Sequence, residues 1–289
     1  MPEIPAENVL AEPVNRNTAP AVAWAGTRIY RKCDDARIII SPADQLVFNE
    51  EQFENDVHYG LDFVAEHDMM LSLGIKPTRP EPGYGYIQLG DPLESTHINK
   101  VQSFTEKPER EFATIFMESG EFLWNTGMFI TNVHYLRDWY LKIIPVIPFR
   151  LANLTANYTL EEEAQYVVEH YPAYPNLSMD KAVLEMTENA YVLKCKFGWA
   201  DIGTWHALYE CMQKTENDNV VLDSEVIMED CRNNIVCLPK GHIGIINGLE
   251  GYIVAEQDDV LLICPKGDSS ALIRKYVNEV GMKYGENYV

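Results

Sequence analysis

Apolar and polar positions between residues 19 and 212 alternate in the rhythm of strands and helices. Residues 37–41 (RIIIS) form a compact β-branched run that leads into Pro42-Ala43-Asp44, which is typical of a short buried strand followed by a loop. Apolar side chains recur at helical spacing in residues 52–66, and residues 69–75 are the next apolar run. Further helices are predicted at 19–32, 111–119, 133–142, 160–170 and 204–212, and further strands at 97–104 and 191–197. This alternation predicts a Rossmann-like α/β fold with a mostly parallel sheet.

From residue 219 onward the pattern changes to short apolar strands separated by turns. Strands are predicted at 220–222, 235–238, 243–246, 252–256 and 260–264, and a helix is predicted at 270–283. Short strands at regular spacing are typical of an all-β unit. We therefore expect two domains: an α/β domain at 1–217 and a small β-rich C-terminal domain at 218–289.

The net charge restricts the ligands that the protein can attract. A formal charge of -21 repels nucleic acid and anionic membranes, so we expect neither as a partner. The same acidity also favours solubility. If the ligand is a phosphate compound, then local Lys and Arg side chains, backbone N–H groups and a metal must overcome the field of the whole molecule.

The cysteines and the N-terminus indicate a cytoplasmic protein. The cysteines stand at positions 33, 195, 211, 231, 237 and 264, without a Cys-x-x-Cys pair or zinc-like spacing to histidine. The N-terminal residues lack the basic and apolar regions of a secretory signal, and the apolar runs are too short to span a bilayer. Reduced thiols in the cytoplasm are the interpretation that fits these features.

Two aspartates stand after predicted strands and are candidate metal ligands. Asp44 follows the strand at 37–41, and Asp201 follows the strand at 191–197. Ligands of open α/β sheets collect at the carboxyl ends of the strands, and Mg²⁺ prefers a few carboxylates together with substrate phosphates. An aspartate after a strand can equally serve as a turn residue or a helix N-cap, so the pattern alone leaves both interpretations open.

Two segments that each contain one basic residue could bind anions. Glu106-Lys107-Pro108 follows the strand at 97–104, and the proline favours an extended Lys107 that reaches a phosphate. A solvated surface ion pair is the alternative for this segment. Arg16, Asn17 and Thr18 precede a helix whose N-terminus would attract an anion, although simple capping explains them as well.

Two further segments could approach a ligand. Gly83-Tyr84-Gly85 permits close approach of the backbone to a ligand, and a tight turn explains it equally well. Asn125 stands among large apolar residues in the segment 124–129 (WNTGMF). A buried Asn must be hydrogen-bonded, either to a ligand or to the backbone.

Taken in order, these segments resemble the bacterial mannose-1-phosphate guanylyltransferases over nearly the whole chain. The matching segments are Arg16-Asn17-Thr18-Ala19-Pro20, Pro42-Ala43-Asp44, 74–87 (GIKPTRPEPGYGYI), Glu106-Lys107-Pro108, 124–129 (WNTGMF), Ser178-Met179-Asp180 and 198–205 (GWADIGTW). The resemblance implies a nucleotidyltransferase that makes GDP-mannose and pyrophosphate from GTP and mannose 1-phosphate.

The resemblance also implies roles for the candidate residues. The implied catalytic residues are Asp44, Lys107 and Asp201, with magnesium held by Asp44 and Asp201 and the sugar phosphate held by Lys107. Glu106 and Asn125 would bind the mannose hydroxyls. The remaining substrate-binding residues implied are Arg16, Asn17, Gly83, Tyr84, Gly85 and Asp180.

The sequence departs from the family pattern at three places. Gln45 stands where the family usually has His, and Pro82 stands where it usually has Thr. The apolar strand, glycine-rich loop and Pro-Lys-Gln with which the family opens are not in this chain, and neither is the isomerase domain fused to some relatives. The departures predict impaired activity, and they predict a homo-oligomer or aggregate formed through the strand at 37–41.

Three alternatives remain open at this point. The true start of the protein could lie upstream of Met1, or the chain could be a non-catalytic remnant or partner subunit that binds a sugar nucleotide. A related pyrophosphorylase for another base or sugar is disfavoured by the segments at 16–20 and 124–129.

Overall fold

The computed structural model describes residues 4–147, 158–187, 189–267 and 269–285. The chain forms two compact units. The first comprises residues 1–43 and 47–199, and the second comprises residues 44–46 and 200–289. Each unit has its own clusters of buried apolar side chains, which indicates that each has its own core.

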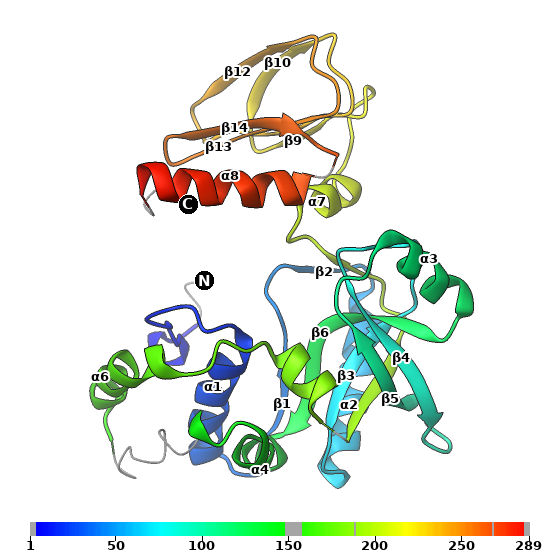
Figure 1. Ribbon diagram of the computed structural model, residues 1–289, viewed down its shortest axis with the longest axis vertical. Helices are drawn as coiled ribbons and strands as arrows, with labels where there is room; N and C mark the ends of the chain where they lie inside the picture. Colours follow the sequence, from blue (N-terminus) through cyan, green and yellow to red (C-terminus); the bar gives the residue numbers. More distant parts are fainter. Residues whose placement is uncertain (1–3, 148–157, 188, 268, 286–289) are drawn as a thin grey trace. The chain divides into compact units, whose positions relative to one another are not determined.

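A six-stranded sheet forms the centre of the first unit (Figure 1). In spatial order its strands are β1 (Arg37–Ile40), β6 (Phe122–Asn132), β3 (Met70–Ile75), β7 (Ala190–Cys195), β5 (Ile98–Thr105) and β4 (Gly85–Pro92). The predicted α/β class is confirmed, but the mostly parallel sheet is not. Among the strands described, only β3 and β7 pair in parallel in this sheet. β1, β3 and β7 run the same way, but β6 opposes its three neighbours and β4 and β5 form an antiparallel pair, so the sheet is mixed.

The helices of the first unit lie close to the positions that the apolar spacing predicts. They are α1 (Thr18–Lys32), α2 (Glu50–Glu66), α3 (Arg110–Ser119), α4 (Val133–Ile143) and α6 (Leu160–His170). Asn17, Asn49 and Asn132 cap α1, α2 and α4, because their side chains accept hydrogen bonds from backbone N–H groups of the first turn. These caps satisfy donors that the helix itself leaves unpaired and so fix where each helix begins.

Two elements close to Asn125 and Asp180 are not predicted by the sequence pattern. One is β6, whose apolar run is interrupted by the polar and glycine residues Asn125, Thr126 and Gly127. The other is a short π-helix, Lys181–Glu185, which follows Asp180 directly. Single-turn π-helices have no distinct apolar period, and they occur often at functional sites.

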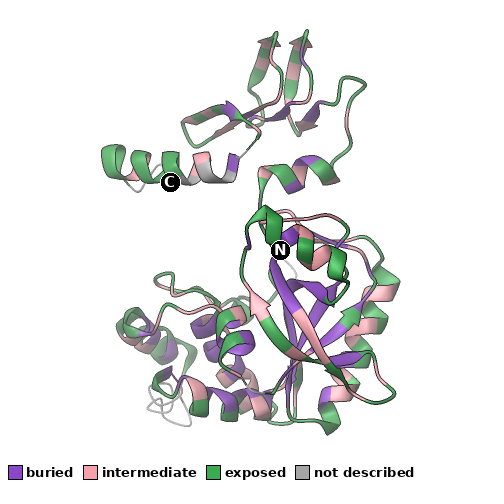
Figure 2. Cartoon of the chain, turned by 45° about the vertical axis from the view of Figure 1, so that its right-hand side comes forward, coloured by how far each residue is buried: buried purple, intermediate pink, exposed green. Residues whose placement is uncertain are grey.

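Much of this sheet is formed by buried residues, which are purple in Figure 2. Successive residues of a strand point to opposite faces, so Met70 packs in one cluster with side chains of α1 and α4. Leu71 and Leu73 pack in a second cluster with side chains of α2 and α3. All six residues of β3 are therefore buried, which explains why this strand is a continuous apolar run in the sequence.

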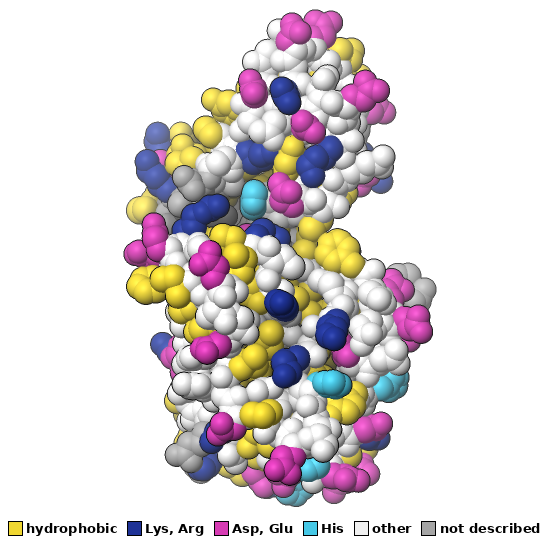
Figure 3. All heavy atoms as spheres, turned by 90° about the vertical axis from the view of Figure 1, so that its right-hand side faces the viewer, with side chains coloured by type: hydrophobic (Ala, Val, Ile, Leu, Met, Phe, Trp, Pro, Cys, Tyr) yellow, Lys and Arg dark blue, Asp and Glu magenta, His cyan; other side chains and the backbone are white. Residues whose placement is uncertain are grey.

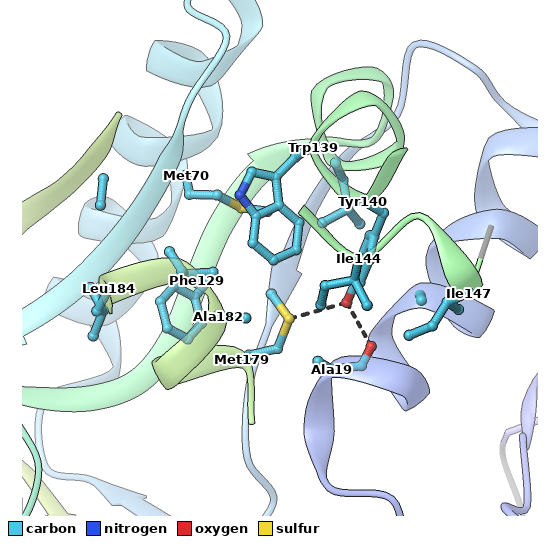
Figure 4. Close-up of a cluster of buried hydrophobic side chains, with 14 of the residues drawn as sticks. Ala19, Met70, Phe129, Trp139, Tyr140, Ile144, Ile147, Met179, Ala182 and Leu184 are labelled. Carbon is cyan, nitrogen blue, oxygen red and sulfur yellow. Dashed lines mark hydrogen bonds between the residues drawn. The ribbon is translucent and has the colours of Figure 1, made fainter. Parts of the chain in front are cut away.

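Tyr140 of α4 connects two segments of the candidate site through the core (Figure 4). Its hydroxyl oxygen lies 2.6 Å from the backbone oxygen of Ala19 in α1 and 3.2 Å from the sulfur of Met179. Burial raises the pKa of Tyr140 well above its ordinary value, so the hydroxyl keeps its proton and donates. The first turn of α1 is thereby tied to the segment that carries Asp180.

β1 is less buried than its sequence predicts. Ile38 and Ile40 are half-buried, whereas Ile39 is 37% exposed. Among the described strands, β1 pairs only with β6, because it is the terminal strand of the sheet. The expectation of a buried strand is therefore wrong in this respect, since a terminal strand lacks one neighbour.

The described part of the second unit contains short strands and two helices. One sheet has the order β14 (Val260–Pro265), β13 (Tyr252–Gln257), β11 (Ile235–Cys237) and β9 (Val220–Leu222), and a second pairs β10 (Glu225–Glu229) with β12 (Ile243–Asn247). The helices are α7 (Trp205–Cys211) and α8 (Ser269–Tyr284). Tyr209 of α7 and Ile273 of α8 pack with Ile235 and Ile253, which covers one face of the larger sheet. β10 was not predicted, because its apolar run is only Val226, Ile227 and Met228, with a glutamate at each end.

The surface carries dispersed negative charge. Acidic side chains are spread over the face in Figure 3 and do not gather into one patch. All six cysteines are free thiols. In the ranges that the structure describes, no helix combines the length and apolar character needed to cross a membrane.

Candidate active site

Asp44 and Asp201 lie together in the second unit. Asp44 directly precedes β2 (Gln45–Val47), Asp201 is the last residue of β8 (Trp199–Asp201), and these two strands pair. The N–H of Ile202 donates a hydrogen bond of 3.0 Å to the backbone oxygen of Asp44. The two predicted metal ligands are therefore brought side by side by backbone pairing.

Oxygens of both carboxylates lie close to Gly203. A Cβ at this position would lie 2.8 Å from Oδ2 of Asp44 and 2.9 Å from Oδ1 of Asp201. The N–H of Gly203 also donates a hydrogen bond of 2.8 Å to Oδ1 of Asp201, which orients that carboxylate. The arrangement places two anionic oxygens around one small volume beside a glycine.

This pair has the donor chemistry that magnesium requires. Carboxylate oxygens are hard ligands, and Mg²⁺ in phosphoryl-transfer sites is usually bound by one or two carboxylates together with waters and substrate phosphates. No group of three or more His, Cys, Asp or Glu side chains in the described ranges is arranged to hold a metal. A cation here would take its remaining ligands from water and substrate, as magnesium does.

Glu106 and Lys107 follow β5 in the first unit. The ammonium of Lys107 lies 3.6 Å from Oε1 of Glu106, and both side chains are at least half exposed. Lys107 has a φ of 45°, so the extended conformation predicted from Pro108 is wrong. The chain turns sharply after β5, and the left-handed conformation costs about 1 kcal/mol for a residue with a Cβ. The surrounding structure must stabilise this conformation, as is common at functional sites.

The pKa of Glu106 is raised above that of an ordinary glutamate. Partial burial is the main cause, and the negative charges of Asp180 and Glu185 add to it, whereas Lys107 lowers the pKa. Lys107, Asp180 and Glu185 therefore lie close enough to Glu106 to act on its charge. Glu185, on the π-helix, has no signal of its own in the sequence that would have identified it.

Asn125 and Asp180 are joined directly. The side-chain N–H₂ of Asn125 donates a hydrogen bond of 2.6 Å to Oδ1 of Asp180. Asn125 is 9% exposed and belongs to β6, whereas Asp180 precedes the π-helix. The structure thus brings together Glu106, Lys107, Asn125 and Asp180, which the sequence places far apart.

The glycine loop lies beside Glu106. A Cβ on Gly85 would lie 3.1 Å from Oε2 of Glu106 and 2.8 Å from the ring of Phe104, so this position needs glycine. Gly83 donates its N–H to Glu81 at 3.1 Å. Tyr84 packs its ring against Trp124 and Trp199, at centroid distances of 5.2 and 5.0 Å. The side chain of Tyr84 therefore belongs to the core, and the loop would meet a ligand with its backbone.

The segment Arg16–Thr18 caps α1 and contacts the segments around Pro172 and Met179. Asn17 caps α1, and Oγ1 of Thr18 accepts a hydrogen bond of 2.8 Å from the N–H of Met179. Arg16 donates to the backbone oxygen of Pro172. Its Nε is buried without a hydrogen-bond partner in the described part of the chain.

The sequence profile of the family described as nucleotidyl transferase matches residues 4–218. The chain belongs to this family. A Rossmann-like α/β unit with charged side chains after its strands is the arrangement expected of such a nucleotidyltransferase.

The most informative relatives act on mannose 1-phosphate or in alginate biosynthesis according to their names. The chain is 33% identical to a mannose-1-phosphate guanylyltransferase of Salmonella montevideo over 89% of its own length and 54% of that protein's. It is 30% identical to the alginate biosynthesis protein AlgA of Pseudomonas putida over 98% of the chain and 59% of that protein. The nucleotidyltransferase chain thus spans little more than half the length of these curated relatives.

A solved structure supports the fold of this nucleotidyltransferase. A protein of Thermus thermophilus, described as a mannose-1-phosphate geranyltransferase, is similar with a TM-score of 0.77 and 29% identity. The similarity covers 94% of this chain and 77% of that one. The α/β unit with a β-rich C-terminal region is therefore shared with a protein whose name refers to the same sugar phosphate.

Proposed function

We propose that the protein transfers a guanylyl group from GTP to mannose 1-phosphate, releasing pyrophosphate and forming GDP-mannose. The observation that carries the proposal is the pair of carboxylates, Asp44 and Asp201, whose oxygens both lie beside Gly203. Similarity to guanylyltransferases of mannose 1-phosphate supports the choice of base and sugar. The reaction class follows from the family, and the substrates are the proposed part.

The reaction needs positioning and neutralisation of charge more than covalent help. A phosphate oxygen of the sugar phosphate attacks the α-phosphorus of GTP, a new P–O bond forms, and the bond to the β-phosphate breaks as pyrophosphate leaves. Magnesium bound by Asp44 and Asp201 would neutralise negative charge on the phosphates. In a protein with a net charge of -21, such local positive charge is needed to admit two anionic substrates.

A second group of residues would bind the sugar phosphate. Lys107 is at least half exposed and supplies a point charge for the phosphate, while Glu106, Asn125 and Asp180 supply acceptors and a donor for sugar hydroxyls. Holding the nucleophile in a reactive geometry is worth several kcal/mol in such reactions. Arg16, Asn17, Gly83 and Gly85 would lie around the nucleotide or the sugar.

The experiment is a pyrophosphate-release assay with GTP and mannose 1-phosphate, with and without Mg²⁺. We expect release that requires both substrates and the metal, and that is lost in the double variant Asp44→Asn/Asp201→Asn. Binding of GDP-mannose in calorimetry without pyrophosphate release would favour the alternative of a sugar-nucleotide-binding protein without turnover. If neither binding nor release is observed, the proposed substrates are wrong. The free cysteines are consistent with a cytoplasmic site for this reaction.

A further inference from the structure

The hydrogen-bond partners of Asn125 determine which atom of its side-chain amide is the oxygen and which is the nitrogen. The N–H of Gly127 lies 3.2 Å from one side-chain atom of Asn125, and a backbone N–H can only donate, so that atom is the oxygen Oδ1. The nitrogen Nδ2 must then face Asp180, and it donates a hydrogen bond of 2.6 Å to Oδ1 of that side chain. Ser72 completes the set, because its hydroxyl donates a hydrogen bond of 3.2 Å to the same Oδ1.

Ser72 lies on β3, the strand that pairs with β6 next to Asn125. The pairing of β3 with β6 is irregular between Ser72 and Gly74, opposite Asn125, and Gly127 adopts a φ of 71°. Irregularities of this kind change the direction in which a strand's side chains point, and they occur often beside active sites. The hydroxyl of Thr126 anchors the distorted segment by donating a hydrogen bond of 2.8 Å to the backbone oxygen of Leu73.

Of the two hydrogen bonds to Oδ1 of Asn125, the one from Ser72 can be removed by a side-chain substitution without altering the backbone. Ser72 is fully buried, so water cannot easily replace its hydroxyl. Without it, Oδ1 of Asn125 keeps a single donor, and an amide held by fewer hydrogen bonds is free to sample other orientations. Asp180 would then lose the fixed donor that holds its Oδ1.

We propose that Ser72 is a positioning residue for sugar binding, which acts through Asn125 on the carboxylate of Asp180. The inference rests on the proposed function, because it takes a phosphorylated sugar as the ligand of this group. Ser72 would not touch the ligand. It would hold Asn125 so that one oxygen of Asp180 is satisfied internally and the other stays available as an acceptor for a sugar hydroxyl.

The test compares Ser72→Ala with a matched control, Thr131→Val. Thr131 is also fully buried and its hydroxyl donates a hydrogen bond of 2.9 Å to the backbone oxygen of Met69, but it contacts none of the site residues in this chain of hydrogen bonds. Calorimetry with mannose 1-phosphate should show affinity about tenfold weaker for Ser72→Ala, unchanged for Thr131→Val, and restored in large part by Ser72→Thr. GTP affinity should be the same in all of these proteins.

A purely structural role would give a different result. Both Ser72→Ala and Thr131→Val would then lower the melting temperature while sugar-phosphate affinity stayed at the wild-type value, and the proposal would be wrong. Equal weakening of sugar-phosphate affinity by both variants would also overturn it, because the effect would not be specific to the contact with Asn125.

A second readout separates failure of this inference from failure of the proposed function. The side-chain amide resonances of Asn125, observed with ¹⁵N-asparagine labelling and assigned with Asn125→Asp, report the hydrogen bonds without any ligand. We expect them to shift and exchange faster in Ser72→Ala but not in Thr131→Val. Unchanged resonances in Ser72→Ala would refute the positioning role. If the resonances shift but the wild-type protein binds no mannose 1-phosphate, then it is the sugar assignment, and with it the proposed function, that fails.

Discussion

At the scale of single residues, the sequence indicates which residues belong to the candidate site better than it predicts their backbone conformation. Asp44 and Asp201 could be singled out because each follows an apolar strand, and the structure places them beside each other. The φ of 45° at Lys107 could not be predicted, since only the packing of the surrounding chain imposes it. Asn17 and Tyr84 show a further limit of the sequence. Asn17 caps a helix and Tyr84 packs in the core, and the sequence pattern does not distinguish these structural roles from ligand binding.

Gly203→Ala should damage the metal site by sterics alone. The new Cβ would lie 2.8 Å from an oxygen of Asp44 and 2.9 Å from one of Asp201, so both carboxylates must move. Displacement of catalytic groups by about 1 Å can reduce rates about a hundredfold, and we expect a loss of that order in pyrophosphate release. Binding of Mn²⁺, followed by electron paramagnetic resonance, should weaken in parallel. The control is Gly267→Ala in the same unit, where a Cβ meets no atom within 4 Å; equal effects of both variants would contradict the steric argument.

Glu106→Gln should stabilise the protein at neutral pH. The folded-state pKa of Glu106 lies above its unfolded value, mainly through burial, so folding binds a proton and stability falls as pH rises through the folded pKa. The ion pair lost with Lys107 is exposed and contributes little. We expect a melting temperature higher by about 1 °C at pH ~7–8, with the difference vanishing below pH ~4. Exposed Glu118 provides the control variant, Glu118→Gln, and a difference that grows at low pH would show that the sign is wrong.

At the scale of elements, regular apolar periodicity was enough to predict a helix or strand, and interrupted periodicity was not. The capped helices α1, α2 and α4 begin within about two residues of their predicted positions, because spacing and cap chemistry agree. The central strand β6 was missed because Asn125, Thr126 and Gly127 break its apolar run. Asn125 belongs to the candidate sugar site and Gly127 donates a hydrogen bond to it, so the strand was missed at the place where a functional side chain is held. The domain boundary at 217 stays a prediction.

The exposed side of β1 should govern self-association. Ile39 is 37% exposed on a terminal strand, and terminal strands with apolar side chains pair readily with other chains. We expect sedimentation velocity to show concentration-dependent association of the wild-type protein and a monomer for Ile39→Lys, with little change in melting temperature. Ile38→Lys, on the half-buried side that packs against the core, should instead destabilise the fold. A wild-type protein that stays monomeric at high concentration would contradict this expectation.

At the scale of the whole molecule, the two units should unfold as separate cooperative blocks. The buried clusters of the first unit contain no residue of the second, and the reverse also holds among the described residues. Residues that pack in one core unfold together, and residues in separate cores can unfold separately. Calorimetry should therefore show two unfolding transitions instead of one. Leu71→Ala and Ile253→Ala each remove a fully buried side chain, one from each unit, and such changes cost about 2–5 kcal/mol. Each variant should therefore lower one transition and leave the other in place. A single transition that both variants lower equally would show that the chain unfolds as one block.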